Sequence, residues 1–159
     1  MTSAMPFPMF RMDKGGIREI EKFKRSGNGI LFAAGAMWEG VDIPGDALSM
    51  LIIVKLPFPV PDPIGEYEQT LYADMAAYKE FVINPEMLIK LKQGDGRLIR
   101  TEKDSGVVVI LDCRVSVGGP YRNIVLETLP HRWVTNSIED VEKFYLNMKE
   151  PKYFLQASA

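Results

Sequence analysis

Residues 93–114 read Q-G-D-G-R-L-I-R-T-E-K-D-S-G-V-V-V-I-L-D-C-R and connect an expected helix to the clearest strand of the chain. The strand, expected at residues 106–111, is continuously apolar, which is typical of strands covered on both faces in a parallel α/β sheet. The helix is expected to start at Asn84-Pro85, an N-cap residue followed by proline, and to run toward Arg100. This stretch therefore indicates the helix–strand succession of an α/β domain.

Three polar side chains of this helix are expected to share one face. Gln93, Arg97 and Arg100 stand at i, i+4 and i+7, and two guanidiniums with an amide form a patch suited to phosphate oxygens. Gly94 and Gly96 each cost a helix roughly 1 kcal/mol relative to alanine, so they favour a close approach of backbone to a ligand. The apolar face, roughly opposite, is expected to contain Leu88, Leu91 and Leu98. The alternative is that both arginines are solvated charges favoured by a helix C-terminus.

Shorter segments complete an alternation of helices and strands. Two further buried strands are expected at residues 29–34 and 48–56. Other helices are expected at residues 16–25, behind Asp62-Pro63, at residues 121–129 and behind the capping box of Ser137 and Asp140. The helix behind Pro63 is expected to continue through residues at helical spacing, Ile64, Tyr67, Leu71, Met75 and Tyr78. The order indicates an α/β fold with a doubly wound parallel sheet and helices on both faces.

The composition is that of an ordinary globular domain. The 159 residues suffice for about one domain with its own core, and 47% of them are apolar and 25% charged. The formal net charge of −2 does not indicate nucleic-acid binding, so such a role has to rest on local geometry. A single cysteine, Cys113, excludes an internal disulfide and is expected to be buried. No apolar run reaches the ~20 residues of a membrane span, so we expect a cytoplasmic protein without a membrane partner.

A second motif, W-E-G-V-D-I-P-G at residues 38–45, directly follows one of the expected buried strands. In open α/β sheets, ligands bind at the carboxyl ends of strands. Gly40 and Gly45 allow tight backbone paths there, and Glu39 and Asp42 supply acceptors. The segment is therefore a candidate working loop, and the alternative is a turn with incidental acidic residues.

These runs, in this order and at these separations, resemble the second motor domain of superfamily 2 DNA helicases. The resemblance covers roughly residues 7–130 and points to the DinG and XPD-like branch, closest to bacterial DinG-type proteins. The matching runs are residues 29–45, similar to motif V, residues 56–63, similar to the proline-rich segment after the next strand, and residues 93–100 with 104–114, similar to motif VI and its following strand. The resemblance implies a RecA-like domain at residues 1–135, truncated at its N-terminus and lacking its first strand, followed by a helix and tail at residues 136–159.

The resemblance also assigns roles to the two motifs. Arg97 and Arg100 would be arginine fingers aimed at the γ-phosphate of ATP, and Gln93 would orient the attacking water or contact that phosphate. The residues expected to line the nucleotide cleft are Glu39, Gly40, Asp42 and Gly96. The first three would also link hydrolysis to movement along single-stranded DNA, which in this branch usually runs 5′ to 3′.

Several parts of such a motor are absent from the sequence. It contains no Gly-x-x-x-x-Gly-Lys-Ser/Thr loop and no acidic metal-binding box, so ATP with Mg would be bound mainly by a P-loop-bearing RecA-like domain, in the same polypeptide or a separate chain. One cysteine cannot form the iron–sulfur cluster of the branch. Ala34 and Ala36 stand where relatives carry hydroxyls for DNA phosphates. Asp95 is expected to face away from Gln93, and the lone His131 is expected to have no metal or catalytic role.

The resemblance thus implies the C-terminal motor half of an ATP-dependent DNA helicase active in DNA repair, incomplete as an ATPase alone. The alternative is a remnant domain that acts as a non-enzymatic interaction or regulatory module. The intact Gln93, Arg97 and Arg100 favour the first reading, and the two alanines and the acidic charge favour the second.

Overall fold

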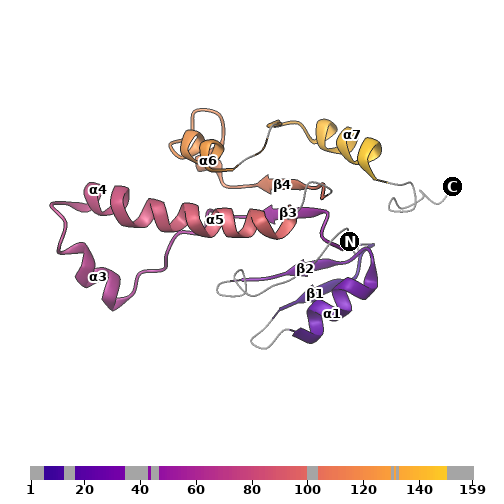
Figure 1. Ribbon diagram of the computed structural model, residues 1–159, viewed down its shortest axis with the longest axis horizontal. Coiled ribbons are helices and arrows are strands. Elements are labelled where there is room, and N and C mark those ends of the chain that lie inside the picture. Colours follow the sequence, from indigo (N-terminus) through magenta and orange to yellow (C-terminus); the bar gives the residue numbers. More distant parts are fainter. Residues whose placement is uncertain are drawn as a thin grey trace, which may run out of the picture.

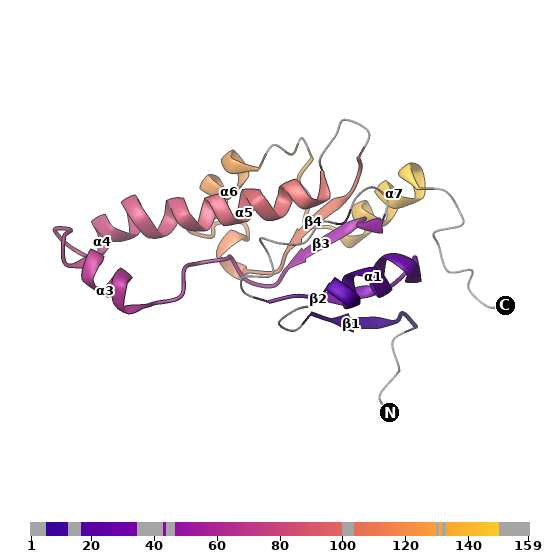
Figure 2. The ribbon, with the colours of Figure 1, turned by 60° about the horizontal axis from the view of Figure 1, so that its bottom comes forward.

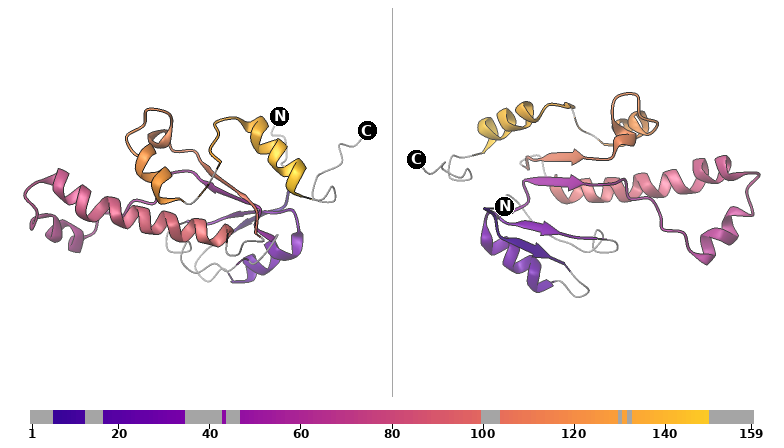
Figure 3. Two further views of the ribbon diagram at one scale, coloured as in Figure 1. Left: turned by 45° about the horizontal axis from the view of Figure 1, so that its top comes forward. Right: turned by 180° about the vertical axis from the view of Figure 1, so that it is seen from behind.

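The strands of the computed structural model form two parallel pairs among the described residues. Strand β1 (Met9–Arg11) pairs with β2 (Ile30–Phe32), and β3 (Met50–Ile53) pairs with β4 (Val107–Ile110). The structure describes residues 6–12, 17–34, 43, 47–99, 104–129, 131 and 133–149. The strands follow one another in the order β4, β3, β2, β1 in Figures 1 and 2 and in the rear view of Figure 3. The α/β class and the parallel arrangement are confirmed.

Each parallel pair is joined by a helical crossover. Helix α1 (Ile17–Ser26) connects β1 to β2, and the longer connection from β3 to β4 contains helix α5 (Asn84–Leu98). Both helices lie on the same side of the strands, in front of them in Figure 1 and behind them in the rear view of Figure 3. Strand β1 is not predicted from the sequence, because the segment before residue 16 has no apolar period.

Helix α1 agrees closely with its prediction. It ends before Gly27, whose φ of +71° is the left-handed conformation that a C′ glycine adopts readily. Its buried residues Ile20 and Phe23 are each 8% exposed and pack with Met12 and Ile43 in a small core of their own. This core fixes α1 against the β1–β2 pair.

The segment behind Asp62 is broken where the sequence predicts one continuous helix. Asp62 caps helix α3 (Pro63–Gln69) as predicted, because its carboxylate accepts the Gly65 N–H at 2.7 Å. The helix then ends, and the Asp74 carboxylate accepts the Ala77 N–H at 2.8 Å to start helix α4 (Met75–Tyr78). A second capping aspartate thus overrides the apolar spacing, and the prediction of one helix through residues 64–78 is wrong.

Helix α5 begins at Asn84 as predicted, but Asn84 is its first helical residue and not its N-cap. The chain enters α5 directly from α4 through a π-helical turn, η2 (Lys79–Ile83), and Ile83 already has helical dihedral angles. The Asn84 N–H reaches back five residues to the Lys79 carbonyl, as in a π-helix. Such a turn accommodates Pro85, which has no N–H for the regular helical ladder.

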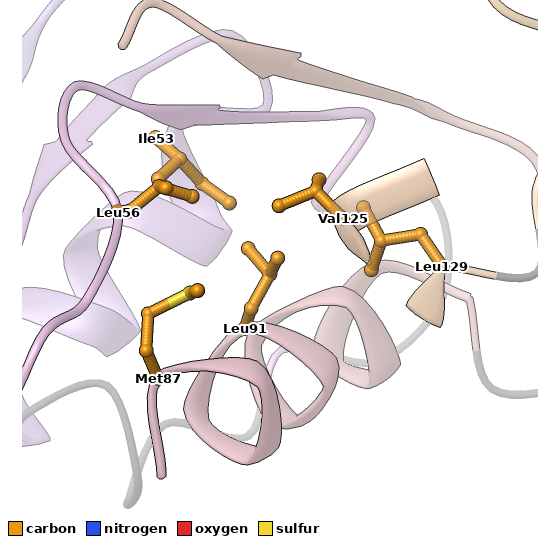
Figure 4. Packing of buried hydrophobic residues seen from close by; sticks show 6 residues of the cluster. All are labelled: Ile53, Leu56, Met87, Leu91, Val125 and Leu129. Atoms are coloured by element: carbon orange, nitrogen blue, oxygen red, sulfur yellow. The ribbon is translucent and has the colours of Figure 1, made fainter. Parts of the chain in front are cut away.

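The main core lies between α5, the β3–β4 pair and helix α6 (Arg122–Thr128). Figure 4 shows its six buried side chains, Ile53, Leu56, Met87, Leu91, Val125 and Leu129. Leu91 and Leu98 are 0% and 3% exposed, and Leu88 packs at the edge of the cluster, so the predicted apolar face of α5 is confirmed.

The chain after β4 runs through a short 3-10 helix, η3 (Cys113–Val115), and α6 to helix α7 (Ile138–Met148). Ser137 caps α7 as predicted by accepting the Asp140 N–H at 3.4 Å. Cys113 is exposed, against the prediction, because it lies on a turn beyond the strand rather than within it. Among the described helices, none combines the length and apolarity that crossing a bilayer requires.

Candidate functional site

The last turns of α5 present two of the three predicted phosphate-facing side chains. Gln93 is exposed and Arg97 is half-buried, and because they stand four residues apart in one helix they point from the same side. That side is opposite Leu91 and Leu98, which are buried in the core. The body of the domain therefore orients Gln93 and Arg97 away from the main core.

Helix α5 ends two residues before Arg100. Helix α5 ends at Leu98, and Ile99 has extended dihedral angles (φ −114°, ψ 107°) while its N–H bonds the Asp95 carbonyl at 3.2 Å. The chain leaves the helix there on its way to β4, so the predicted i+7 position falls beyond the described helix. Arg100 itself lies outside the described residues.

The two glycines of the motif have different surroundings. Gly94 is buried, whereas Gly96 is exposed, and a Cβ built on Gly96 meets no described atom within 4 Å. The described part of the domain thus gives no steric reason for a glycine at 96. A backbone left bare on the surface is open to close approach by a ligand.

Asp95 faces the interior, as expected from its separation from Gln93. It is 4% exposed, and its Oδ1 lies 2.6 Å from Nε2 of His131, for which no metal or catalytic role was expected. The hydrogen bond to Asp95 raises the pKa of the His131 imidazole despite partial burial. The sequence does contain a signal for such a pair, because Asp95 stands at i+4 from Leu91 and so falls on the apolar face of the helix. A buried carboxylate there requires a hydrogen-bonding partner.

A second charged cluster joins the segments that follow β3 and β4. The Arg114 guanidinium donates to the Asp112 carboxylate through Nε at 2.9 Å and Nη2 at 2.6 Å, and the same carboxylate accepts the Leu56 N–H at 2.9 Å. The guanidinium lies 4.5 Å from the ring centre of Phe58 and 5.8 Å from that of Tyr121. These contacts hold the pKa of the Asp112 carboxyl far below its usual range and raise that of Arg114. Arg114 therefore stabilises the contact between these two segments, a structural role that is not predicted from the sequence.

The loop of the second motif lies mostly outside the described residues. This applies to its predicted site residues Glu39, Gly40 and Asp42 and also to Ala36. Ile43 is described, is 4% exposed and packs in the core of α1. Ala34 is exposed two residues beyond β2. Within the described residues, no group of three or more side chains has the composition and proximity to hold a metal ion.

Parallel strands with helical crossovers define an α/β domain, and one of its helix ends presents an amide and a guanidinium. Residues 3–132 match the family model of the helicase C-terminal domain. The chain belongs to this family and is a helicase C-terminal domain of the DinG type.

The relatives are much longer proteins. The chain is 40% identical over 131 residues to the ATP-dependent DNA helicase YoaA of Haemophilus influenzae and 41% identical over 128 residues to that of Escherichia coli, covering 80% and 79% of this chain and 20% of each relative. It is 35% identical over 134 residues to a protein named 3'-5' exonuclease DinG in Bacillus subtilis, covering 82% of this chain and 14% of that protein. The chain thus spans about a fifth or less of the length of these relatives.

Proposed function

We propose that this chain is the C-terminal motor half of an ATP-dependent DNA helicase. Its α5 supplies Arg97, followed by Arg100, as arginine fingers to ATP held by a separate P-loop-bearing RecA-like domain. The observation that supports this most directly is the orientation of Gln93 and Arg97 on the side of α5 opposite its buried leucines. Two donors held on one rigid element suit the equatorial oxygens of a transferring phosphoryl group.

The donor chemistry of this edge fits phosphate rather than its metal ion. Gln93 and Arg97 offer N–H groups to anionic oxygens, and a guanidinium cannot coordinate Mg²⁺. Mg²⁺ would accordingly be held mainly by the P-loop-bearing domain, where it neutralises phosphate charge. The exposed backbone at Gly96 allows the nucleotide to approach closely beside Arg97.

The second motif would couple the nucleotide to DNA in this proposal. Glu39, Gly40 and Asp42 follow β2, at whose carboxyl end ligands of parallel sheets collect. From there they would transmit closure of the two domains on ATP to a single DNA strand. A role in DNA repair belongs to the same proposal, and it rests on the resemblance of the motifs to this helicase branch rather than on a residue of this chain.

The purified chain is expected to hydrolyse no ATP by itself and to restore hydrolysis when combined with a P-loop-bearing motor domain. In that assembled enzyme, Arg97→Ala should lower kcat by on the order of 10³-fold, because the finger stabilises charge that develops in the transition state. Binding of single-stranded DNA should change little. Steady-state ATPase assays and fluorescence anisotropy with labelled single-stranded DNA measure the two effects.

Lys92→Ala is the matched control. Lys92 is an exposed cation of the same helix, five residues before Arg97 and therefore directed elsewhere. Near-normal turnover of Arg97→Ala, or equal losses in the two variants, would contradict the finger role. A chain that never supports hydrolysis with any P-loop-bearing domain would instead favour the non-enzymatic interaction module.

A further inference from the structure

The end of α5 contains a carboxylate on its buried side. Asp95 stands between Leu91 and Leu98 on the face that packs into the core, and it is 4% exposed. Burial penalises the charge, and so does the helix macrodipole, because Asp95 lies in the C-terminal turns where the dipole is negative. Asp95 is therefore costly to the helix unless a cation neutralises it.

His131, from a different part of the chain, is the partner of Asp95, and its imidazole is a cation when protonated. It lies two residues after Leu129, the C-cap of α6, and its Nε2 is 2.6 Å from Asp95 Oδ1. The imidazole is 30% exposed and the carboxylate 6% exposed, so the contact is screened from water chiefly on the aspartate side. The Asp95–His131 pair thus ties the segment after α6 to the end of α5.

Asp95 stands between two residues that stabilise a helix poorly. Both of its neighbours, Gly94 and Gly96, are glycines, which lower helix stability and widen the accessible dihedral angles. Arg97 follows directly, on the opposite side of the same turn. A small rotation at the glycines would redirect Arg97, so a contact that anchors Asp95 also restrains the guanidinium.

We propose that His131 is a positioning residue, which holds Asp95 and thereby sets the direction in which α5 presents Gln93 and Arg97. This inference rests on the proposed function in one respect only, namely that the presented side chains act on ATP. The anchoring itself is a property of the chain and can be measured without nucleotide.

The pair is strongest when the imidazole is charged. The raised pKa of His131 means that the stabilisation is fully present below the unfolded value of about 6.5 and is lost as the pH rises through the folded value. Asp95 is the charged group that acts on His131 from α5. The other ionisable groups near the pair in sequence, on the two elements it joins, are Lys92 and Arg97 on α5 and Glu127 on α6.

The first experiment uses the chain alone. His131 is its single histidine, so one imidazole signal in an NMR titration reports the pair without ambiguity. We expect this signal to titrate above about 6.5 and to return toward that value in Asp95→Asn. The backbone amide signals of Gln93 and Arg97 should move with the same midpoint, and they should stop doing so in His131→Gln.

The second experiment uses the assembled enzyme defined above. His131→Ala should lower kcat on the order of tenfold with little change in KM for ATP, since misdirection of Arg97 weakens the transition state more than binding. His131→Gln keeps a side-chain N–H for Asp95 but cannot titrate. We expect turnover of the parent to decline at alkaline pH as His131 loses its proton. The His131→Gln variant should retain most of the turnover and should not show this decline.

The outcomes separate this inference from the proposed function. Amide signals at Gln93 and Arg97 that ignore the His131 titration, or a pH profile unchanged by His131→Gln, overturn the positioning role. If the amide signals follow the titration while the assembled enzyme hydrolyses no ATP, the anchoring stands and the proposed motor function fails. If His131→Ala does not fold, His131→Gln alone decides the question.

Discussion

Asp112 connects the segments that follow β3 and β4. Its carboxylate accepts the Leu56 N–H beyond β3 and two N–H groups of the Arg114 guanidinium, which in turn covers the ring of Phe58. Asp112 is 8% exposed, so few of these groups could find water if the carboxylate were removed. One short polar side chain therefore connects the segment that leads to α3 with the segment that leads to α6.

We expect Asp112→Ala to lower the free energy of unfolding by about 2 kcal/mol, because it leaves the Leu56 N–H and the guanidinium without their acceptor. Arg114→Lys should cost about 1 kcal/mol, since an ammonium loses the forked pair and the ring contact, and Arg114 is partly solvated. Urea unfolding of the chain measures both values. Equal stability of Asp112→Ala and the parent would contradict the role given to this carboxylate.

The same carboxylate makes stability depend on pH in the acid range. Its pKa is lowered in the folded chain, so its contribution is fully present above the unfolded value of about 3.9 and declines as the pH falls below that value toward the folded one. Asp112→Ala should lack this component. The difference in unfolding free energy between parent and variant should accordingly shrink from pH 7 to pH 3, whereas a constant difference would argue against it.

At the scale of elements, the helices show how capping and turn chemistry compete with apolar spacing. Asp74 starts a new helix within a stretch whose spacing predicts continuity. Helix α5, with Pro85 in its first turn, continues directly from a π-helical turn and has no capping side chain. The glycine at position 106, ahead of β4, is required by close packing rather than by capping. A Cβ there would lie 2.6 Å from the Leu98 side chain and 2.8 Å from the Ser49 carbonyl oxygen, so only glycine lets β4 pass the end of α5.

Two glycine-to-alanine substitutions should therefore act in opposite directions. Gly106→Ala should destabilise the chain by about 2 kcal/mol or more, because backbone atoms must move away from the new methyl group. Gly96→Ala should stabilise it by up to about 1 kcal/mol, since the site is open and helical. Thermal and urea unfolding of the two variants and the parent measure both changes in stability.

The Gly96→Ala variant also tests the proposed function. If the bare backbone at Gly96 is kept for nucleotide approach, Gly96→Ala should weaken ATP turnover in the assembled enzyme while the isolated chain becomes more stable. A more stable variant with unchanged turnover would show that close approach at this position is not required.

At the scale of the whole molecule, the C-terminal helix is attached to the strands by a side chain far along the sequence. The Tyr145 hydroxyl of α7 donates to the Ser49 carbonyl oxygen at 2.6 Å, and the same oxygen accepts the Val107 N–H at 3.1 Å. Burial raises the pKa of the Tyr145 phenol to about 12. In Figures 1 and 3, α7 lies beyond the start of β4, on the side away from α1.

Tyr145→Phe removes the hydroxyl but leaves the Ser49 carbonyl bonded to Val107. We expect the unfolding free energy to fall by only about 1 kcal/mol. Hydrogen exchange in α7 should become faster than in the parent, while exchange in α5 should change less. Phe144→Leu, on the neighbouring position of the same helix, is the control for a loss of aromatic volume. Unaltered exchange in α7 of the Tyr145→Phe variant would mean that other contacts hold this helix.

The sequence alone determined what depends on neighbours along the chain. Apolar runs and capping residues located strands β2, β3 and β4 and helices α1, α6 and α7 to within a few residues, since these signals act over one or two turns. The period of α5 likewise placed Gln93 and Arg97 opposite Leu91. The family followed from the order of its motifs and their separations along the chain.

The tertiary structure decided what depends on residues far apart in sequence. It gave Asp95 a partner 36 positions away in His131, anchored α7 through Ser49 and set Asp112 beneath Arg114 and Leu56. It also ended α5 before Arg100, where the chain has to turn toward β4. Local patterns could not foresee these outcomes, because burial and pairing of charges arise only when distant segments pack and exclude water from between them.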